Sequence, residues 1–194
     1  MKNGKKPTLA QKKFLQGKGL VPENWLIVKD TPVERITVKE IADTCGTTRQ
    51  TFYRNFQDKY DLINWYFDKI LLESFEHMGQ GKTIYEGLVR KFQYIEQESA
   101  FFRAAFRTDE QNCLKEHDFE LILQFYTDLI ARKTSQPLGQ ELQFLLEMYC
   151  QGSVYMTVKW VLGGMKDSPR EMSDKLVEAM PPKLAEVFGK LKLL

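Results

Sequence analysis

The chain has 194 residues, of which 43% are hydrophobic and 28% are charged, a composition typical of a globular protein with one large core or two smaller ones. No run of eighteen apolar residues is present, which excludes a membrane-spanning helix, and three scattered cysteines favour reduced thiols in a cytoplasm over a disulfide framework. Residues 1–60 hold twelve Lys/Arg against six Asp/Glu, whereas the remainder holds sixteen against twenty. A basic N-terminal third followed by an acidic remainder is typical of a protein in which one part contacts phosphate.

The segment 36–59 has the start and stop signals of a helix followed by a tight turn. Thr37 and Glu40 have the Thr-x-x-Glu spacing of a capping box, which predicts that the first helix starts at Thr37. Gly46 can adopt the left-handed conformation that a tight turn needs, so we expect this helix to end there. The small side chain of Ala42 would let a second helix cross close to the first.

A second short helix is predicted over residues 49–56, with Thr48 as its N-cap. Phe52 and Phe56 are four residues apart and therefore lie on one side of it. The polar side chains then face outward, where an arginine can pair with guanine and a glutamine with adenine through two hydrogen bonds. This pattern predicts a helix-turn-helix over about residues 37–56. The outward side chains are those of Arg49, Gln50, Thr51 and Asn55.

Helix start and stop signals recur along the rest of the chain, and we find no strand-like alternation. Thr83 and Glu86 form a second capping box, and Thr108 begins a Thr-x-x-Gln start signal. Ser168 and Pro169 have the identities of an N-cap and a first helical residue. The predicted fold class is therefore all-α. Helices are expected over about residues 59–77, 84–98 and 100–107, in a helix or helix pair ending near 133, and over 138–162 and 169–180.

Apolar side chains cover more than one side of the longest predicted helix, residues 138–162. Such a helix must be buried on more than one side. We expect one side to face its own core and the other to meet a second copy of the chain; the alternative is a larger monomeric core. The side chains assigned to the dimer interface are those of Leu142, Leu145, Met156 and Trp160. Much of the remaining surface belongs to Phe144, Met148, Tyr155, Val158 and Leu162.

Aromatic side chains are concentrated between residues 92 and 106 and recur in two later helices. An apolar pocket with a few polar tips would suit a small organic effector. The alternative for each of these side chains is that it simply fills the core. The candidate pocket residues are Phe92, Phe102, Phe106, Phe125, Tyr126, Met148 and Tyr149.

No arrangement of residues predicts an enzyme, a metal site or a bound cofactor. The glycines at positions 79 and 81 lack the spacing and the preceding strand of a phosphate-binding loop. His77 and His117 show no metal-ligand spacing, and the acid pairs lie on solvated helix ends without an aligned partner.

The motifs of the helix-turn-helix segment resemble the DNA-binding domain of TetR-type bacterial transcriptional regulators. The matching residues are Ile36-Thr37-Val38-Lys39-Glu40-Ile41-Ala42, Gly46, Thr51-Phe52-Tyr53-Arg54-Asn55-Phe56, Asp58-Lys59 and Leu62. Several C-terminal segments resemble one TetR subgroup, which includes activators of dihydroxyacetone kinase operons. These segments are Gly152-Ser153-Val154-Tyr155, Lys159-Trp160, residues 163–169 and Met180-Pro181-Pro182-Lys183.

The resemblance implies a cytoplasmic, Ω-shaped homodimer that regulates transcription. A three-helix helix-turn-helix domain, residues 1–65, would bind a partly palindromic operator in double-stranded DNA. A helical bundle, residues 66–194, would bind a small organic effector and dimerise. By position, Thr37, Tyr53 and Lys59 are expected at phosphates, and Thr47, Thr48, Arg49, Gln50 and Thr51 near base edges.

Side chains at the edge of the second helix have more than one possible role. Tyr53 is either a core aromatic or a phosphate donor, and we favour the phosphate because its hydroxyl can reach out of the buried face. Arg54 either reaches phosphate or pairs with a nearby acid. Lys59 lies at a helix start, where the helix dipole also favours an anion.

The chain departs from the TetR pattern at three places. Thr47 stands where the family usually has an apolar residue, and Asn55 where a histidine is common. Gly17, Gly19 and Pro22 interrupt the first helix, which is ordinarily continuous. These departures concern the docking pose more than the function, although the broken first helix and Thr47 give some support to one alternative: an interaction protein with the TetR fold that acts through partner proteins without reading an operator.

Overall fold

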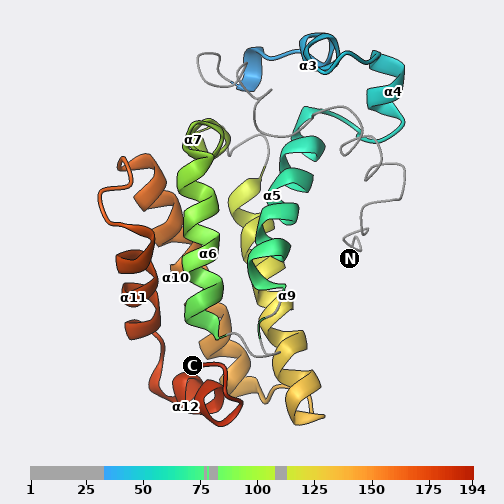
Figure 1. Ribbon diagram of the computed structural model, residues 1–194. Helices are drawn as coiled ribbons and strands as arrows, with labels where there is room; N and C mark the ends of the chain where they lie inside the picture. Colours follow the sequence, from blue (N-terminus) through green and yellow to red (C-terminus); the bar gives the residue numbers. More distant parts are fainter. Residues whose placement is uncertain (1–32, 77, 79–82, 108–112) are drawn as a thin grey trace. The chain divides into compact units, whose positions relative to one another are not determined.

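The computed structural model describes residues 33–76, 78, 83–107 and 113–194. Every regular element within these ranges is a helix, which confirms the all-α prediction (Figure 1). The chain divides into two compact units, one made of Met1–Phe67 and Ala100–Asn112 and the other of Asp68–Ser99 and Cys113–Leu194. Among the described helices, none has the length and apolar character needed to cross a membrane.

The first unit is built around a helix-turn-helix and a short aromatic helix. Its described elements are the 3-10 helix η2 (Val33–Arg35), α3 (Val38–Thr44), α4 (Arg49–Tyr53), the N-terminal part of α5 (Lys59–Phe75) and most of α7 (Ser99–Arg107). Aromatic side chains of α5 pack edge-on against those of α7, with ring centroids 5.0 Å apart for Tyr66 and Phe101 and 5.9 Å apart for Phe67 and Phe102. The core of this unit is therefore formed by segments distant in sequence.

The second unit is a bundle of longer helices. It contains the C-terminal part of α5, α6 (Ile84–Gln97), α9 (Leu114–Thr134), α10 (Gln140–Leu162), α11 (Pro169–Glu178) and α12 (Pro182–Lys190). Helix α6 packs against α11, and α10 packs against α9 and α12 (Figure 1). The start of α6 meets the C-terminal residues, where the Ile84 amide donates to the Leu193 carbonyl at 2.7 Å, which satisfies a backbone donor at the start of the helix.

The local start signals are confirmed. Capping boxes are present at Thr37, Thr83 and Ser168, each with its N3 glutamate bonded back to the N-cap amide. Helices α10 and α11 also occur where they were expected, and their ends lie within two residues of the predicted limits. The start signal at Thr108 falls outside the described residues, as do the predictions for residues 1–30.

Two elements differ from the sequence prediction. Helix α4 ends at Tyr53 instead of Phe56, because the chain turns after one and a half turns, although Phe56 remains buried beneath it. Helix α12 was not predicted, since two prolines were interpreted only as a stop signal. The second of these prolines, Pro182, occupies the first helical position, where proline starts a helix, and Leu184 and Phe188 bury one face of it.

Candidate functional site

The turn between α3 and α4 depends on Gly46. Its φ of +59° lies in the left-handed region, and the Thr47 amide donates across the turn to the Ala42 carbonyl at 2.9 Å. This six-to-one bond, with the Gly46 amide donating to Asp43, is the Schellman arrangement that ends a helix. Ala42 is almost fully buried, in keeping with a close approach of the two helices.

The inner side of α4 is held by aromatic packing. Phe52 and Phe56 are both buried, with ring centroids 5.5 Å apart, and Phe56 lies 6.0 Å from the Trp65 ring of α5. These contacts fix which side of α4 points inward, because two large side chains on one face must be buried together. Cys45 is buried close by in sequence, and burial raises the pKa of its thiol to about 11, so it stays protonated near neutral pH.

The outer side of α4 presents polar side chains to solvent. Arg49 and Gln50 in its first turn are exposed, as is Arg54 just after its last residue. Tyr53 is 58% exposed, with its ring set edge-on against Phe52 at 5.5 Å. Within the described part of the chain, the side chains of these four outward residues make no hydrogen bond or ion pair, so their polar groups remain available to a ligand.

The other polar residues of this segment are used in part by the fold itself. The Thr48 hydroxyl accepts from the Thr51 amide at 3.2 Å and lies 3.0 Å from the Thr51 hydroxyl. Asn55 donates to the Thr51 carbonyl at 2.8 Å. Thr47 is half-buried behind the turn. These residues therefore shape α4 as well as lying near its outer face.

Thr37 has a structural role of its own at the start of α3. Its hydroxyl accepts from the Glu40 amide and donates to the Glu40 carboxylate at 2.8 Å, while the same carboxylate accepts from the Thr37 amide. The bond from the Thr37 amide is the main reason that the pKa of Glu40 is lowered. Lys39, in the same first turn, is an exposed cation that the sequence analysis did not single out. Its position two residues after the N-cap was the signal that could have identified it.

Lys59 does not point freely into solvent. Its ammonium donates to the carbonyls of Glu34 at 2.7 Å and Ile36 at 3.0 Å. At the same helix start, the Asp58 carboxylate accepts from the amides of Tyr60 and Asp61 at 2.8 and 2.9 Å. Two of the three ammonium donors and two backbone amides at the start of α5 are therefore already paired within the unit.

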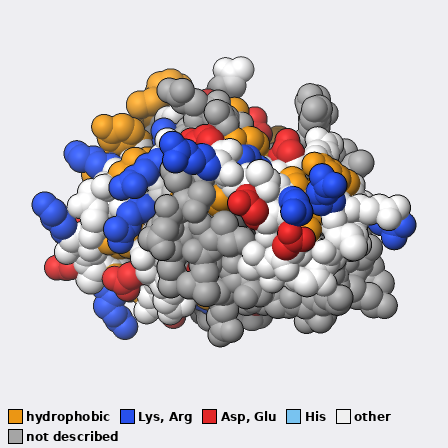
Figure 2. Space-filling model, turned by 90° about the horizontal axis from the view of Figure 1, so that it is seen from above, with side chains coloured by type: hydrophobic (Ala, Val, Ile, Leu, Met, Phe, Trp, Pro, Cys, Tyr) orange, Lys and Arg blue, Asp and Glu red, His pale blue; other side chains and the backbone are white. Residues whose placement is uncertain are grey.

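Basic side chains are exposed at several separate points on the face seen from above, with carboxylates between them (Figure 2). Along the helix-turn-helix and the residues just after it, the exposed cations Lys39, Arg49 and Arg54 are interspersed with the exposed acids Glu40, Asp43 and Asp58. Attraction of this segment to phosphate thus depends on where individual cations lie, since no continuous run of basic residues is present in it.

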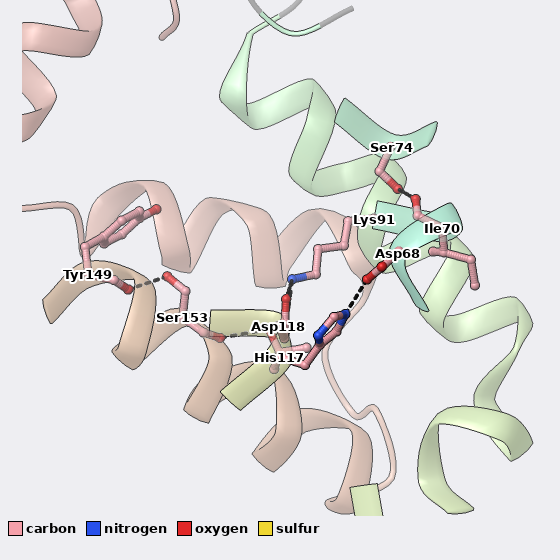
Figure 3. Close-up of polar contacts among 9 residues, drawn as sticks. Asp68, Ile70, Ser74, Lys91, His117, Asp118, Tyr149 and Ser153 are labelled. Carbon is pink, nitrogen blue, oxygen red and sulfur yellow. Dashed lines mark hydrogen bonds and ion pairs between the residues drawn. The ribbon is translucent and has the colours of Figure 1, made fainter. Parts of the chain in front are cut away.

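The second unit contains two neighbouring ion pairs, one buried and one partly exposed (Figure 3). The Lys91 ammonium lies 3.4 Å from the Asp118 carboxylate, and both side chains are buried. His117, the preceding residue of α9, bonds through Nε2 to the Asp68 carboxylate of α5. That bond raises the pKa of His117, whereas burial raises the pKa of Asp118.

These charges were missed at the sequence level, although a signal was present. Lys91 interrupts the apolar stripe of α6, three residues after Leu88 and four before Ile95. Asp118 interrupts the stripe of α9 in the same way, between Leu114 and Ile122. A charged residue at a core position of an amphipathic helix indicates a buried partner, because an unpaired buried charge is costly.

A small cavity adjoins the Lys91 side chain. Its volume of about 10 Å³ is room for about one water molecule. Tyr149, in its wall, donates its hydroxyl to the Leu176 carbonyl at 3.0 Å. The polar lining consists of Lys91, Tyr126, Tyr149, Ser153 and Thr157, and the apolar lining of Phe75, Leu88, Ile122 and Leu176.

The seven predicted pocket residues are not gathered in one cavity. Tyr126 and Tyr149 line the small cavity. Phe92 packs edge-on against Trp160 at 5.2 Å, and Phe125 is stacked on Phe75 at 5.0 Å while lining an open groove of about 530 Å³. The groove also involves Asp128, Ala131 and Arg132.

The remaining three candidates lie elsewhere. Phe102 and Phe106 are buried in the first unit, because α7 contributes its aromatic side to Tyr66 and Phe67 of α5. Met148 is 60% exposed, because it lies on the outer side of α10, one residue before the inward-facing Tyr149. The expectation of a single aromatic pocket shared by all seven residues is thus replaced by several separate packing sites.

Helix α10 exposes an apolar stripe along one side. Phe144, Met148 and Tyr155 are 62%, 60% and 65% exposed. Their spacing of four and seven residues places them on one face of the helix. Met156 and Leu162, 40% and 42% exposed, border the same face. Most of the predicted interface residues therefore lie on a different side of α10 from this exposed stripe.

The predicted interface residues have different environments. Met156 is exposed, and Leu142 and Leu145 are half-buried. Trp160 is only 6% exposed, and its indole N–H donates to the Asp167 carbonyl at 2.8 Å. It is a core residue of its own unit, because the same side of α10 that carries Tyr149 packs inward.

Comparison with known proteins adds three matches to family models, two of them of the TetR type. A family model of the transcriptional regulator C-terminal region, of the TetR type, matches residues 82–181, and the model of the tetR family of bacterial regulatory proteins matches residues 29–65. A model of a domain of unknown function matches residues 1–40. No curated protein shows significant sequence similarity to the chain.

The chain is also similar to solved structures, one of which matches over nearly the whole chain. It is that of the dihydroxyacetone kinase operon activator DhaS, with a TM-score of 0.60 over 96% of this chain and 98% of the other. The two sequences are 15% identical, so the likeness concerns the fold alone.

Proposed function

This chain belongs to the TetR family of bacterial transcriptional regulators, and we propose that it binds a specific operator in double-stranded DNA as a homodimer under the control of a small organic effector. Helix α4 would be the recognition helix. The proposal depends above all on the first turn of α4, where Arg49 and Gln50 are exposed and their side chains are free of partners among the described residues, while Phe52 anchors the opposite side.

The chemistry of these side chains suits a major groove. An arginine can donate two parallel hydrogen bonds to guanine O6 and N7, and a glutamine can pair in two ways with adenine. Tyr53 and Arg54 flank them with an exposed hydroxyl and a guanidinium that can reach phosphate, and Lys39 adds a cation at the start of α3. Thr47, Thr48, Thr51 and Asn55 would lie near the bases at the ends of this surface.

The test begins with selection of an operator from random-sequence duplexes by the parent protein. Arg49→Ala and Gln50→Ala should each weaken binding to that operator by about 1–3 kcal/mol and relax the preference at one base position. The measurement is an equilibrium binding titration against operators carrying every base at each position.

A matched control is Lys133→Ala, which removes an exposed cation at the end of α9. It should leave the base preference of the parent intact. If the double variant Arg49→Ala/Gln50→Ala selects the same sequence as the parent, α4 does not read the operator. If the parent itself selects no sequence, the interaction-protein alternative is favoured.

The exposed stripe of α10 supports the homodimer. Phe144, Met148 and Tyr155 form an exposed apolar stripe that a monomer would leave in water. Gly152 lies on the exposed surface of α10 with no atom near the position of an added Cβ, so a second backbone could approach there. Two heads held by one dimer would bind two half-sites of a partly palindromic operator far more tightly than one head alone.

The polar lining of the small cavity in the second unit supports the proposal of effector control. Lys91, Tyr126 and Tyr149 bring donors and acceptors to an enclosed space, which is the kind of lining that orients a small ligand. A ligand larger than one water would need these side chains to move. An effector found by screening for release of the operator should act less strongly on Tyr126→Phe, whose operator binding without effector should equal that of the parent.

A further inference from the structure

Lys59 differs from the other described cations of residues 36–59. Lys39, Arg49 and Arg54 are exposed, whereas the Lys59 ammonium is bonded to backbone carbonyls of its own unit. This ammonium has three N–H donors, and two of them are used by the Glu34 and Ile36 carbonyls. Ile36 immediately precedes Thr37, the N-cap of α3, and Lys59 is the first residue of α5. A single side chain therefore joins the segment before the helix-turn-helix to the helix after it.

The two hydrogen bonds close a loop in the chain. Residues 34–59 contain all of α3, the turn and α4, so the loop encloses the whole of the proposed DNA-reading segment. The hydrophobic side of α4 fixes which face is buried, but a helix of five residues has few contacts to fix its direction. A charge-assisted tie at both ends of the segment restricts that direction.

The surroundings of Lys59 are unfavourable for a phosphate. The charged groups that act on its ammonium are the carboxylates of Glu34, Asp58 and Glu40, and the Asp58 carboxylate already caps the start of α5. A phosphate brought to this place would meet three negative groups around one cation. The Tyr60 ring, 5.2 Å from the ammonium, covers a further side of it.

We infer that Lys59 is a positioning residue, whose ammonium ties residues 34 and 36 to the start of α5 and thereby holds α4 in the direction needed for operator reading, without itself binding DNA. This inference rests on the proposed function of α4. It assigns the charge-dependent contact with phosphate to exposed cations such as Lys39 and Arg54 instead.

The experiment compares Lys59→Met with Lys39→Met, which removes an exposed cation from the same unit. Binding to the selected operator and to a duplex of scrambled sequence is titrated over a range of salt concentrations. Each phosphate contact contributes about 0.9 to the slope of log affinity against log salt. Lys59→Met should leave the slope unchanged and lower the preference for the operator over the scrambled duplex roughly tenfold, equivalent to the loss of one base contact.

The control variant should behave in the opposite way. Lys39→Met should reduce the slope by about 0.9 for both duplexes and leave their ratio unchanged. Lys59→Arg, which keeps the charge and gains donors, should restore the operator preference. A slope reduced by about 0.9 in Lys59→Met, or an unchanged operator preference in that variant, would overturn the inference.

A second measurement needs no DNA. Amide hydrogen exchange over residues 33–56 should be faster in Lys59→Met than in the parent and unchanged in Lys39→Met, because only the first variant opens the loop. Equal exchange in parent and Lys59→Met would also overturn the inference. If the parent does not distinguish the two duplexes, the proposed function fails, while exchange still decides whether the tie exists.

If Lys59→Met does not fold, Lys59→Gln takes its place. Glutamine removes the charge but keeps an amide with two donors. If Lys59 is a positioning residue, the slope of log affinity against log salt should be the same in Lys59→Gln as in the parent. A slope lower by about 0.9 would identify Lys59 as a phosphate ligand.

Discussion

At the scale of single residues, Gly46 illustrates how a local conformation places functional side chains. Its φ of +59° reverses the chain so that Thr48 can cap α4, and Arg49 and Gln50 follow directly in the first turn. Any side chain with a Cβ is strained in this conformation. The space around the glycine is open, with no atom within 4 Å of an added Cβ, so the strain of a substitution would come from the backbone alone.

Gly46→Ala should therefore destabilise the protein by about 1 kcal/mol, the cost of a left-handed alanine less its gain in restricting the unfolded chain. Chemical denaturation monitored by circular dichroism measures this change. Gly189→Ala is the matched control, since this glycine lies in α12 with open space and an ordinary φ. Alanine there should leave stability unchanged or raise it by about 0.5 kcal/mol. Equal effects at the two sites would contradict the backbone argument.

At the scale of elements, α10 shows how one helix can serve two surfaces. Tyr149, Val154 and Val161 face the bundle, whereas Phe144 and Tyr155 face solvent. A helix with low amphipathicity is the sequence signature of such a double role, because both sides are apolar. The exposed side differs from the side first assigned to a partner, and Trp160 in particular belongs to the core.

Met148→Glu tests the proposed dimer face at its centre. A carboxylate there would be buried against a second copy, often near its own symmetry mate, and should shift the protein to monomer. Sedimentation equilibrium measures the mass directly. Leu72→Glu is the matched control, because Leu72 of α5 is 49% exposed and lies outside the stripe. A dimer that persists in Met148→Glu would place the interface elsewhere, and a monomeric parent would remove the dimer proposal altogether.

At the scale of the whole molecule, the chain passes between its two units three times, and ion pairs lie close in sequence to these crossings. Asp68 is the first residue of the second unit, and His117 follows shortly after the chain re-enters it at Cys113. Their hydrogen bond joins α5 to α9, and the neighbouring Lys91–Asp118 pair joins α6 to α9. The stability of the second unit therefore depends on the protonation of these paired groups.

The His117 pair predicts a pH dependence of stability. Because the bond to Asp68 raises the pKa of His117 above its unfolded value of 6.5, the folded protein holds this proton more tightly. The stabilisation is complete below that unfolded value and is lost as the pH rises through the folded pKa. The free energy of unfolding should thus fall with rising pH above 6.5 in the parent and less steeply in His117→Gln.

Denaturant titrations at a series of pH values provide the measurement. Asp68→Asn should reproduce the shallower dependence of His117→Gln, because it removes the main cause of the raised pKa. The acids Asp118 and Glu120, which also act on His117, are unchanged in both variants. Parallel curves for the parent and both variants would show that this pair does not contribute.

The sequence by itself determined most of the helices and the turn between α3 and α4, because their causes are local; α12 is the exception, since its two prolines were interpreted only as a stop signal. Thr37 and Glu40 form their capping box three residues apart, and Gly46 adopts the left-handed conformation within a single turn. Phe52 and Phe56 share one face of the segment whatever lies beneath them. The outward placement of Arg49 and Gln50 follows from the same short-range geometry. These features could be predicted because each depends on residues within about one helical turn of one another.

Only the tertiary structure decided which of several possible partners each side chain has. Lys59 bonds to carbonyls more than twenty residues away, Lys91 meets Asp118 across 27 residues, and Phe102 packs in the unit that the sequence analysis had not assigned to it. Both sides of α10 are apolar, so its periodicity could not tell which one the bundle would cover. The physical reason is that burial depends on the joint packing of distant segments, and local sequence leaves that choice open.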